Sequence, residues 1–211
     1  MPKNYQRELE SCLRTLNGRP RLLLHSCCAP CSSYVLEYLS PYFEITVDYY
    51  NPNLDSAEEH ALRSAEQARL IQQAPFCRDV SLETVAYDPD AFYKAVKGLE
   101  QIPEGGERCF ACYRLRLEQA AKRCRDGGFD FFTTTLSISP HKNAAKLNEI
   151  GEELATRYNV RWLASDFKKK NGVKRSTELA AEYDLYRQDY CGCVFSKQEA
   201  KKRLQKEEST Q

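Results

Sequence analysis

The stretch LLLHSCCAPC (residues 22–31) joins a short apolar run to three cysteines. The run Leu22–Leu24 predicts a buried β-strand, and a helical pattern begins soon after it. A strand that passes directly into a helix is the place where open α/β folds position their chemistry. Cys27, Cys28 and Cys31 at this turn therefore indicate a functional site rather than ordinary packing.

Strand and helix patterns alternate along the chain of 211 residues. Strands are expected over Arg21–Ser26, Phe43–Tyr50, Leu82–Tyr87, Phe129–Leu136 and Arg161–Ser165. Strands that alternate with helices at this spacing favour parallel pairing through crossover helices. We predict a doubly wound α/β fold with a mainly parallel sheet of four or five strands, flanked by helices, and a helical C-terminal part.

The length allows one substantial core. We expect an N-terminal helical extension over residues 1–19, a single α/β domain that carries the chemistry over 20–196, and a polar C-terminal helix or tail over 197–211. Ser56 and Glu59 form a capping box that predicts a helix start. No apolar run approaches the roughly 20 residues that a spanning helix needs, so we expect a cytoplasmic protein without a membrane partner.

Ten cysteines in such a chain favour metal or redox chemistry, because disulfide scaffolds belong to short secreted proteins. Seven of them form three groups, namely Cys27, Cys28 and Cys31, then Cys109 and Cys112, then Cys191 and Cys193. An iron–sulfur cluster explains this surplus better than a single tetrahedral zinc site. Zinc and a metal-free thiol/disulfide relay stay open, and Cys191 with Cys193 either ligates metal or forms a redox-active disulfide.

The C-terminal part of the chain is basic. Residues 161–211 contain 12 Lys/Arg against 8 Asp/Glu, and the remainder of the chain is slightly acidic. A local basic face suits a polyanion such as RNA, and a solvated helix face is the alternative interpretation.

Five separated motifs resemble the cobalamin-independent epoxyqueuosine reductases of the QueH type. They are HSCCAPCSS (25–33), YYNPN (49–53), PEGGERCFACYRLRL (103–117), GFDFFTTTLSISPHKN (128–143) and YRQDYCGCVFS (186–196). The resemblance implies a tRNA-modifying oxidoreductase that reduces epoxyqueuosine at the wobble position to queuosine, with loss of water, as the last step of queuosine biosynthesis. It also implies a [4Fe–4S] cluster and a second iron, with Cys27, Cys28, Cys109 and Cys112 as ligands. Cys31, Cys191 and Cys193 are further candidate ligands because of their grouping in the sequence.

The implied partners are a tRNA anticodon loop carrying epoxyqueuosine and an unidentified electron donor. Removing the epoxide oxygen needs two electrons, two protons and an acid at that oxygen. We expect Tyr50 to stack on the base and Asn51 or Asn53 to bond its polar edge. The candidate phosphate ligands are Lys168, Lys169, Lys170, Lys174, Arg175 and Arg187, and the candidate proton donors are His141 and Tyr190.

Two other functions stay open. A cluster-dependent tRNA sulfur-transfer enzyme that activates its substrate with ATP would carry a glycine-rich phosphate loop after the first strand, and the turn at residues 27–31 contains no glycine. A zinc-stabilised RNA-binding module without catalysis would be colourless and would lose its fold when the metal is removed.

Overall fold

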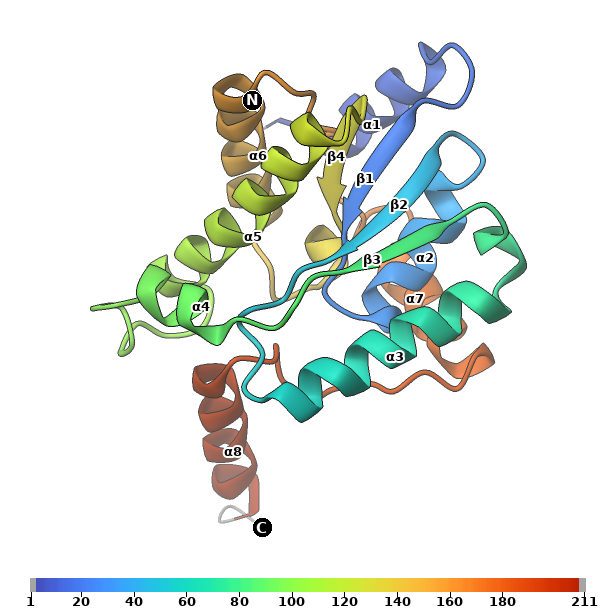
Figure 1. Cartoon of the computed structure of the whole chain (residues 1–211). Helices are drawn as coiled ribbons and strands as arrows, with labels where there is room; N and C mark the ends of the chain where they lie inside the picture. The colour runs from blue at the N-terminus through green and yellow to red at the C-terminus, as the bar shows by residue number, and fades with distance from the viewer. Residues whose placement is uncertain (1–2, 209–211) are drawn as a thin grey trace.

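Four parallel strands form the central sheet among residues 3–208, the part of the chain that the computed structural model describes (Figure 1). They are β1 (Arg21–His25), β2 (Glu44–Tyr49), β3 (Ser81–Thr84) and β4 (Phe131–Thr134), in the order β3-β2-β1-β4. Every neighbouring pair runs parallel, which confirms the predicted class. The outer ends of the predicted segments 1–19 and 197–211 lie outside the described residues.

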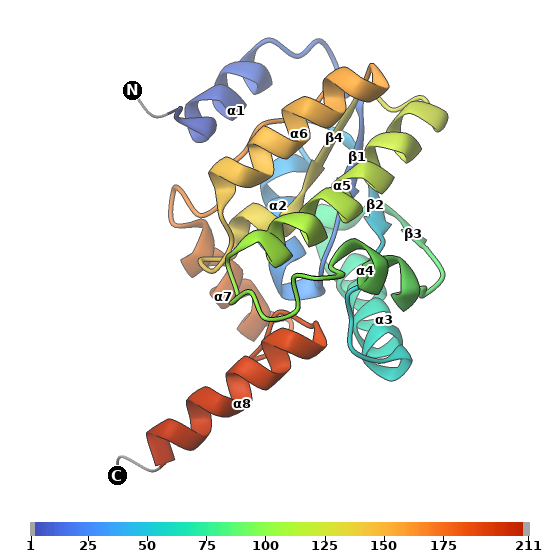
Figure 2. The same ribbon diagram turned by 90° about the vertical axis from the view of Figure 1, so that its left-hand side faces the viewer.

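Helices cover both faces of the sheet. One face packs against α2 (Ala29–Leu39), α3 (Ala57–Gln73) and α7 (Gly172–Glu182), and the other packs against α5 (Glu107–Asp126) and α6 (Ala144–Tyr158) (Figures 1 and 2). In β1, Leu22 and Leu24 belong to the first core, whereas Leu23 belongs to the second. Because both faces are buried, β1 needs the continuous apolar run that the sequence contains.

Three further α-helices and two short 3-10 helices, Pro75–Cys77 and Thr135–Ile138, complete the secondary structure of the described residues. Helix α1 (Tyr5–Arg14) packs its leucines into the first core, and α4 (Pro89–Ala95) precedes α5. Helix α8 (Val194–Glu208) projects away from the body (Figures 1 and 2). The Ser56 hydroxyl accepts a hydrogen bond from the Glu59 amide at 3.2 Å, so the predicted cap of α3 is confirmed. None of the described helices is both long and apolar enough to span a bilayer.

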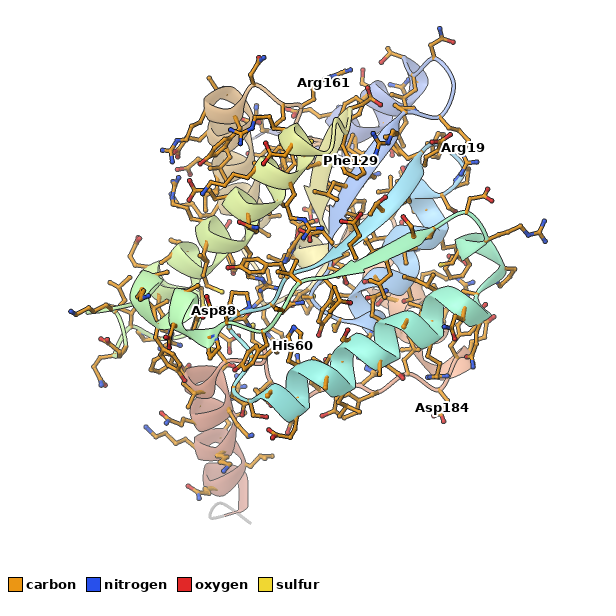
Figure 3. The ribbon with its side chains drawn as sticks, viewed as in Figure 1. Arg19, His60, Asp88, Phe129, Arg161 and Asp184 are labelled. Atoms are coloured by element: carbon orange, nitrogen blue, oxygen red, sulfur yellow. The ribbon has the colours of Figure 1, made fainter. Side chains whose placement is uncertain are left out.

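The strand order creates one topological switch point. The chain runs from β1 outward through β2 to β3 and then returns to place β4 on the other side of β1. Figure 3 shows the two ends of the sheet: Arg19 and Phe129 precede strands at one end, and His60 and Asp88 follow strands at the other. The carboxyl ends of β1 and β4 therefore lie side by side where doubly wound folds bind their ligands.

The predicted fifth strand is reduced to a single bridge between Phe132 and Trp162. The buried Asn148 side chain explains why pairing stops. Its amide nitrogen donates to the Ser165 carbonyl at 2.9 Å, and its oxygen accepts from the Ser165 amide and from the Trp162 indole, both at 3.0 Å. These backbone groups are satisfied by α6 instead of by a neighbouring strand.

Candidate metal centre

Three cysteines lie together at the end of β1. The sulfur atoms of Cys27, Cys28 and Cys31 all fall within 4.8 Å of one another, and 3.8 Å separates those of Cys27 and Cys28. Cys28 is the N-cap of α2 and makes no side-chain capping bond, so its sulfur is free to face the other two. The turn predicted from the sequence thus gathers its thiols at the switch point.

Hydrogen bonding within this trio favours one thiolate. The pKa of Cys27 lies well below its ordinary value because the thiols of Cys28 and Cys31 hydrogen-bond to it. The hydroxyl of Thr135, which follows β4, lies 3.5 Å from the same sulfur. The same interactions raise the pKa of Cys31 well above its ordinary value. A soft, anionic sulfur with two adjacent thiols is the donor set that thiophilic metals select.

Helix α5 brings a second pair of thiols to this end of the sheet. Cys109 and Cys112 both lie on its buried face, as the i, i+3 spacing predicts. The Gly105 amide donates to the Cys109 sulfur at 3.3 Å, and Cys109 belongs to the apolar cluster against which Cys27 packs. Cys112 packs with Cys193 in a third small cluster.

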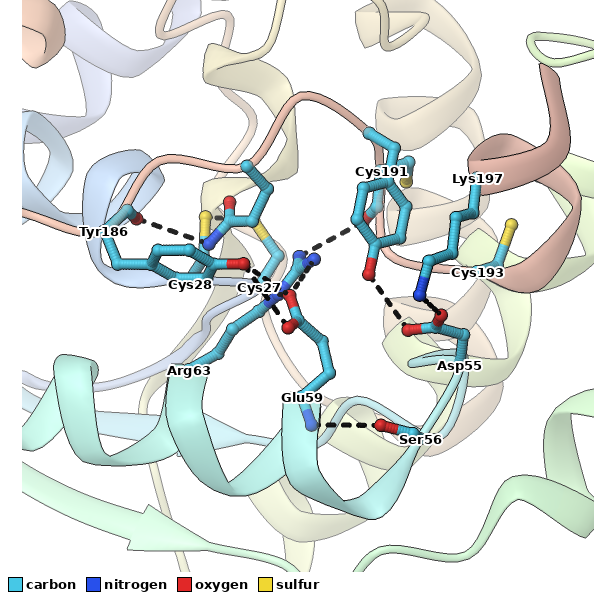
Figure 4. A network of polar contacts seen from close by, with 12 residues as sticks. Cys27, Cys28, Asp55, Ser56, Glu59, Arg63, Tyr186, Cys191, Cys193 and Lys197 are labelled. Atoms are coloured by element: carbon cyan, nitrogen blue, oxygen red, sulfur yellow. Dashed lines mark hydrogen bonds and ion pairs between the residues drawn. The ribbon is translucent and has the colours of Figure 1, made fainter. Parts of the chain in front are cut away.

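The segment containing Cys191 and Cys193 is fastened to α3 by a polar network (Figure 4). Arg63 pairs with Glu59 at 2.6 Å and donates to the Cys191 carbonyl at 3.5 Å, and Tyr186 donates to Glu59. Asp55 accepts hydrogen bonds from Tyr190 at 3.0 Å and from Lys197 at 2.5 Å. All ten cysteines are free thiols.

Two buried cations that the sequence analysis missed stand beside these sulfurs. The Lys142 ammonium lies 2.8 Å from the Cys191 sulfur and 3.5 Å from the Glu104 carboxylate. Arg116 on α5 is 2% exposed. The position of Arg116 beside these cysteines could have been predicted from the sequence. Arg116 follows Cys109 by seven residues and Cys112 by four, so the three residues share one face of the helix.

A cavity of about 270 Å³ opens beside the trio. Its lining comes from helices α2, α3, α5, α7 and α8 and from the segments that precede α2, α5 and α8 and follow β4. It includes Cys27, Cys28, Cys31, Arg116, His141, Lys142, Arg187, Tyr190, Cys191 and Arg203. Both proton-donor candidates therefore reach it. His141 is exposed at the rim, whereas Tyr190 is half-buried with its hydroxyl bonded to Asp55, and burial with this bond raises its pKa to about 12.

The candidate base-binding residues are not part of the cavity lining. Tyr50, Asn51 and Asn53 are buried and do not line the cavity. The Asn51 amide nitrogen donates to the Ser26 carbonyl at 2.9 Å, and its oxygen accepts from Arg116 at 2.5 Å. Contact between these three residues and a substrate stays a prediction.

The candidate phosphate ligands differ in their surroundings. Lys168 donates to the carbonyls of Ser137 and Lys142 at 3.0 and 3.3 Å. Lys170 pairs with Glu10, and Arg175 pairs with Glu37, each at 2.6 Å. Lys169, Lys174 and Arg187 are exposed, and of the six candidates Arg187 lines the cavity.

Comparison with known proteins points to one family. The family model described as "Epoxyqueuosine reductase QueH" matches residues 22–199. A protein of that name from Staphylococcus epidermidis is 43% identical over 182 residues, which cover 84% of this chain and 76% of the relative. The protein of that name from Streptococcus pyogenes serotype M1 is 40% identical, over 92% of this chain and 78% of the relative. The one from Thermotoga maritima is 32% identical, over 83% of this chain and 89% of the relative.

Proposed function

Because the chain belongs to the QueH family of epoxyqueuosine reductases, we propose that it reduces epoxyqueuosine in tRNA to queuosine at the site built from its clustered cysteines. The observation that carries this proposal is the trio of Cys27, Cys28 and Cys31 at the switch point, beside a cavity that holds further thiols. The reaction removes the epoxide oxygen as water and consumes two electrons and two protons. The electron donor is a separate, unidentified partner.

The residues present fit a thiolate-bound iron site. The donor set is sulfur-rich, and the buried hydroxyls of Tyr49 and Tyr113 have no hydrogen-bond partner among the described residues. Burial raises the pKa of both tyrosines, and neighbouring cysteine sulfurs raise it further, namely Cys109, Cys191 and Cys112 for Tyr113 and Cys28 and Cys27 for Tyr49. We propose that the seven clustered cysteines hold a [4Fe–4S] cluster and a second iron. When bound, such iron supplies single electrons and Lewis acidity.

The chain itself provides placement and protons. The cavity beside the trio is large enough for part of a nucleoside, and a substrate bound in it would shield the sulfurs from bulk water. His141 at the rim is the more accessible proton donor for the epoxide oxygen, because the Tyr190 hydroxyl is committed to Asp55. Single-stranded anticodon nucleotides can turn a modified base into such a cavity.

Arginines at the cavity support a role in holding tRNA. Arg187 and Arg203 both line the cavity. Lys174 is exposed on α7 and directly follows Val173, which also lines the cavity. We propose that Arg187, Arg203 and Lys174 contact phosphates beside the modified nucleotide. Phosphate contacts of this kind fix register without reading sequence.

The test is anaerobic purification with assays for iron and acid-labile sulfide, followed by turnover with a reductant and tRNA bearing epoxyqueuosine. We expect a coloured protein that forms queuosine. Cys109→Ala should lose both iron and turnover, whereas Cys12→Ala, on α1 and far from the site in the fold, should keep both. A colourless, zinc-loaded wild-type protein would contradict the redox proposal.

A further inference from the structure

Arg116 is a buried cation without a carboxylate. Among the described residues, no carboxylate oxygen comes within 4.0 Å of its guanidinium. The other two buried arginines each have one, since Arg63 pairs with Glu59 at 2.6 Å and Arg108 pairs with Glu199 at 2.8 Å. A buried charge is tolerated when an opposite charge compensates it, so a different anion must face Arg116.

Two neutral side chains fix the position of this guanidinium. Its Nε donates to His25 Nε2 at 3.2 Å, and one terminal nitrogen donates to Asn51 Oδ1 at 2.5 Å. His25 Nε2 also lies 3.2 Å from the Tyr50 carbonyl oxygen, and His25 Nδ1 lies 2.7 Å from Thr134 Oγ1. Burial and the Arg116 charge lower the pKa of His25 to about 3, so the imidazole beside Arg116 stays neutral.

The open side of Arg116 faces sulfur. Arg116 lines the cavity together with Cys27 and Cys191, and it lies one helical turn beyond Cys112 on the same face of α5. The same cavity is also lined by Cys28 and Cys31. Once deprotonated to bind metal, these cysteines would supply the counter-charge that Arg116 lacks.

We propose that Arg116 is a positioning residue for the redox site: its fixed positive charge, held by His25 and Asn51, offsets the thiolate charge and makes the iron held there easier to reduce. The inference rests on the proposed iron site. Reduction adds negative charge, so a nearby buried cation stabilises the reduced state more than the oxidised state. The residue acts through the metal centre and need not touch the substrate.

The experiment is a potentiometric titration of the visible spectrum of the loaded protein, with iron content measured in parallel. Arg116→Gln removes the charge and should shift the oxidised-to-reduced ratio at a fixed potential at least tenfold toward oxidised, which is about 59 mV for one electron. Arg116→Lys keeps the charge and should shift the ratio much less. Arg114→Gln is the matched control on α5, because Arg114 is half-exposed and pairs with Glu153, and it should leave the ratio unchanged.

A second variant tests the charge without deleting the arginine. Asn51→Asp places a carboxylate against the same guanidinium nitrogen and should lower the potential in the same direction as Arg116→Gln, even if the latter loads iron poorly. If the wild type binds iron and neither Arg116→Gln nor Asn51→Asp shifts the potential, the inference is overturned and the proposed function stays intact. Equal shifts in the Lys and Gln variants would also overturn it, because that result indicates a role in packing. A wild type without iron would overturn both.

Discussion

Asp48 gives the fold a pH dependence that can be calculated from its surroundings. It lies on β2 with its side chain fully buried, and neither carboxylate oxygen has a hydrogen-bond partner among the residues that the structure describes. Arg123 on α5 is the nearest cation, 3.3 Å away. Burial raises the pKa of Asp48 from 3.8 to about 6, and Arg123 only partly opposes this shift. Between about pH 3.8 and pH 6, the folded protein therefore holds a proton at Asp48 that the unfolded chain has released.

The sign follows from linkage. Because the folded-state pKa is the higher one, the full contribution of Asp48 to stability is present below the unfolded pKa of about 3.8 and is lost as the pH rises through about 6. Two pKa units correspond to about 3 kcal/mol of lost stability near neutral pH, and about 1 kcal/mol is already lost near pH 4.5. Asp48→Asn keeps the shape and cannot ionise, so it should be more stable than the wild type by up to about 3 kcal/mol near pH 7.5.

The assay is anaerobic urea unfolding of both proteins at several pH values, and the quantity to compare is the difference in unfolding free energy between them. We expect this difference to grow by about 2 kcal/mol between pH 4.5 and 7.5 and then to level off. Glu83→Gln is the control, since Glu83 also pairs with Arg123 but is half-exposed, and its difference should stay small. A difference for Asp48→Asn that does not change with pH would refute the reasoning.

Three further predictions concern the site. Gly192→Ala should lose iron while keeping its far-UV circular dichroism. Gly192 has φ +118°, and a Cβ there would lie 2.5 Å from Leu54 Cδ2, so the substitution adds a local strain of about 1–3 kcal/mol between Cys191 and Cys193. Full iron content in this variant would contradict the prediction. Arg187→Glu should reduce the slope of log affinity for tRNA against log salt by about one or more and leave the visible spectrum intact, and an unchanged slope would remove Arg187 from the interface. Chelating the metal should leave the far-UV spectrum nearly unchanged, because the two apolar cores on the sheet faces do not depend on it, whereas cooperative unfolding would favour the zinc-stabilised alternative.

The strand ends and the first cysteine group were predictable because their signals are local. The apolar run of β1, the cap at Ser56 and the turn at Cys27 each depend on residues within a few positions of one another. The surroundings of the lysine-rich segment were not predictable in this way. Arg175 pairs with Glu37, which precedes it by 138 residues, and Lys170 pairs with Glu10. Composition showed an excess of cations there but could not show which of them the fold had already paired.

The shortening of the last predicted strand has the same kind of cause. Arg161–Ser165 has strand-like residues, yet the Asn148 side chain on α6 takes the backbone groups of Ser165 that a sheet neighbour would need. A buried amide on a helix can compete with a strand only through tertiary contact, so no reading of residues 161–165 alone could find it.

The switch point of this fold favours a cysteine thiolate where related folds bind a phosphate. In doubly wound proteins that bind nucleotides, the first strand leads into a glycine-rich turn, and a helix N-terminus with free amides faces a phosphate. Here the same helix end carries Cys28 as an N-cap without a side-chain capping bond, and Cys27 and Cys31 flank it. The positive end of α2 and the buried Arg116 both favour anionic sulfur at this place. The electrostatic arrangement that elsewhere binds a phosphate therefore suits the Cys27 thiolate here, and this agrees with the proposal that a redox site occupies a nucleotide-binding position without glycines.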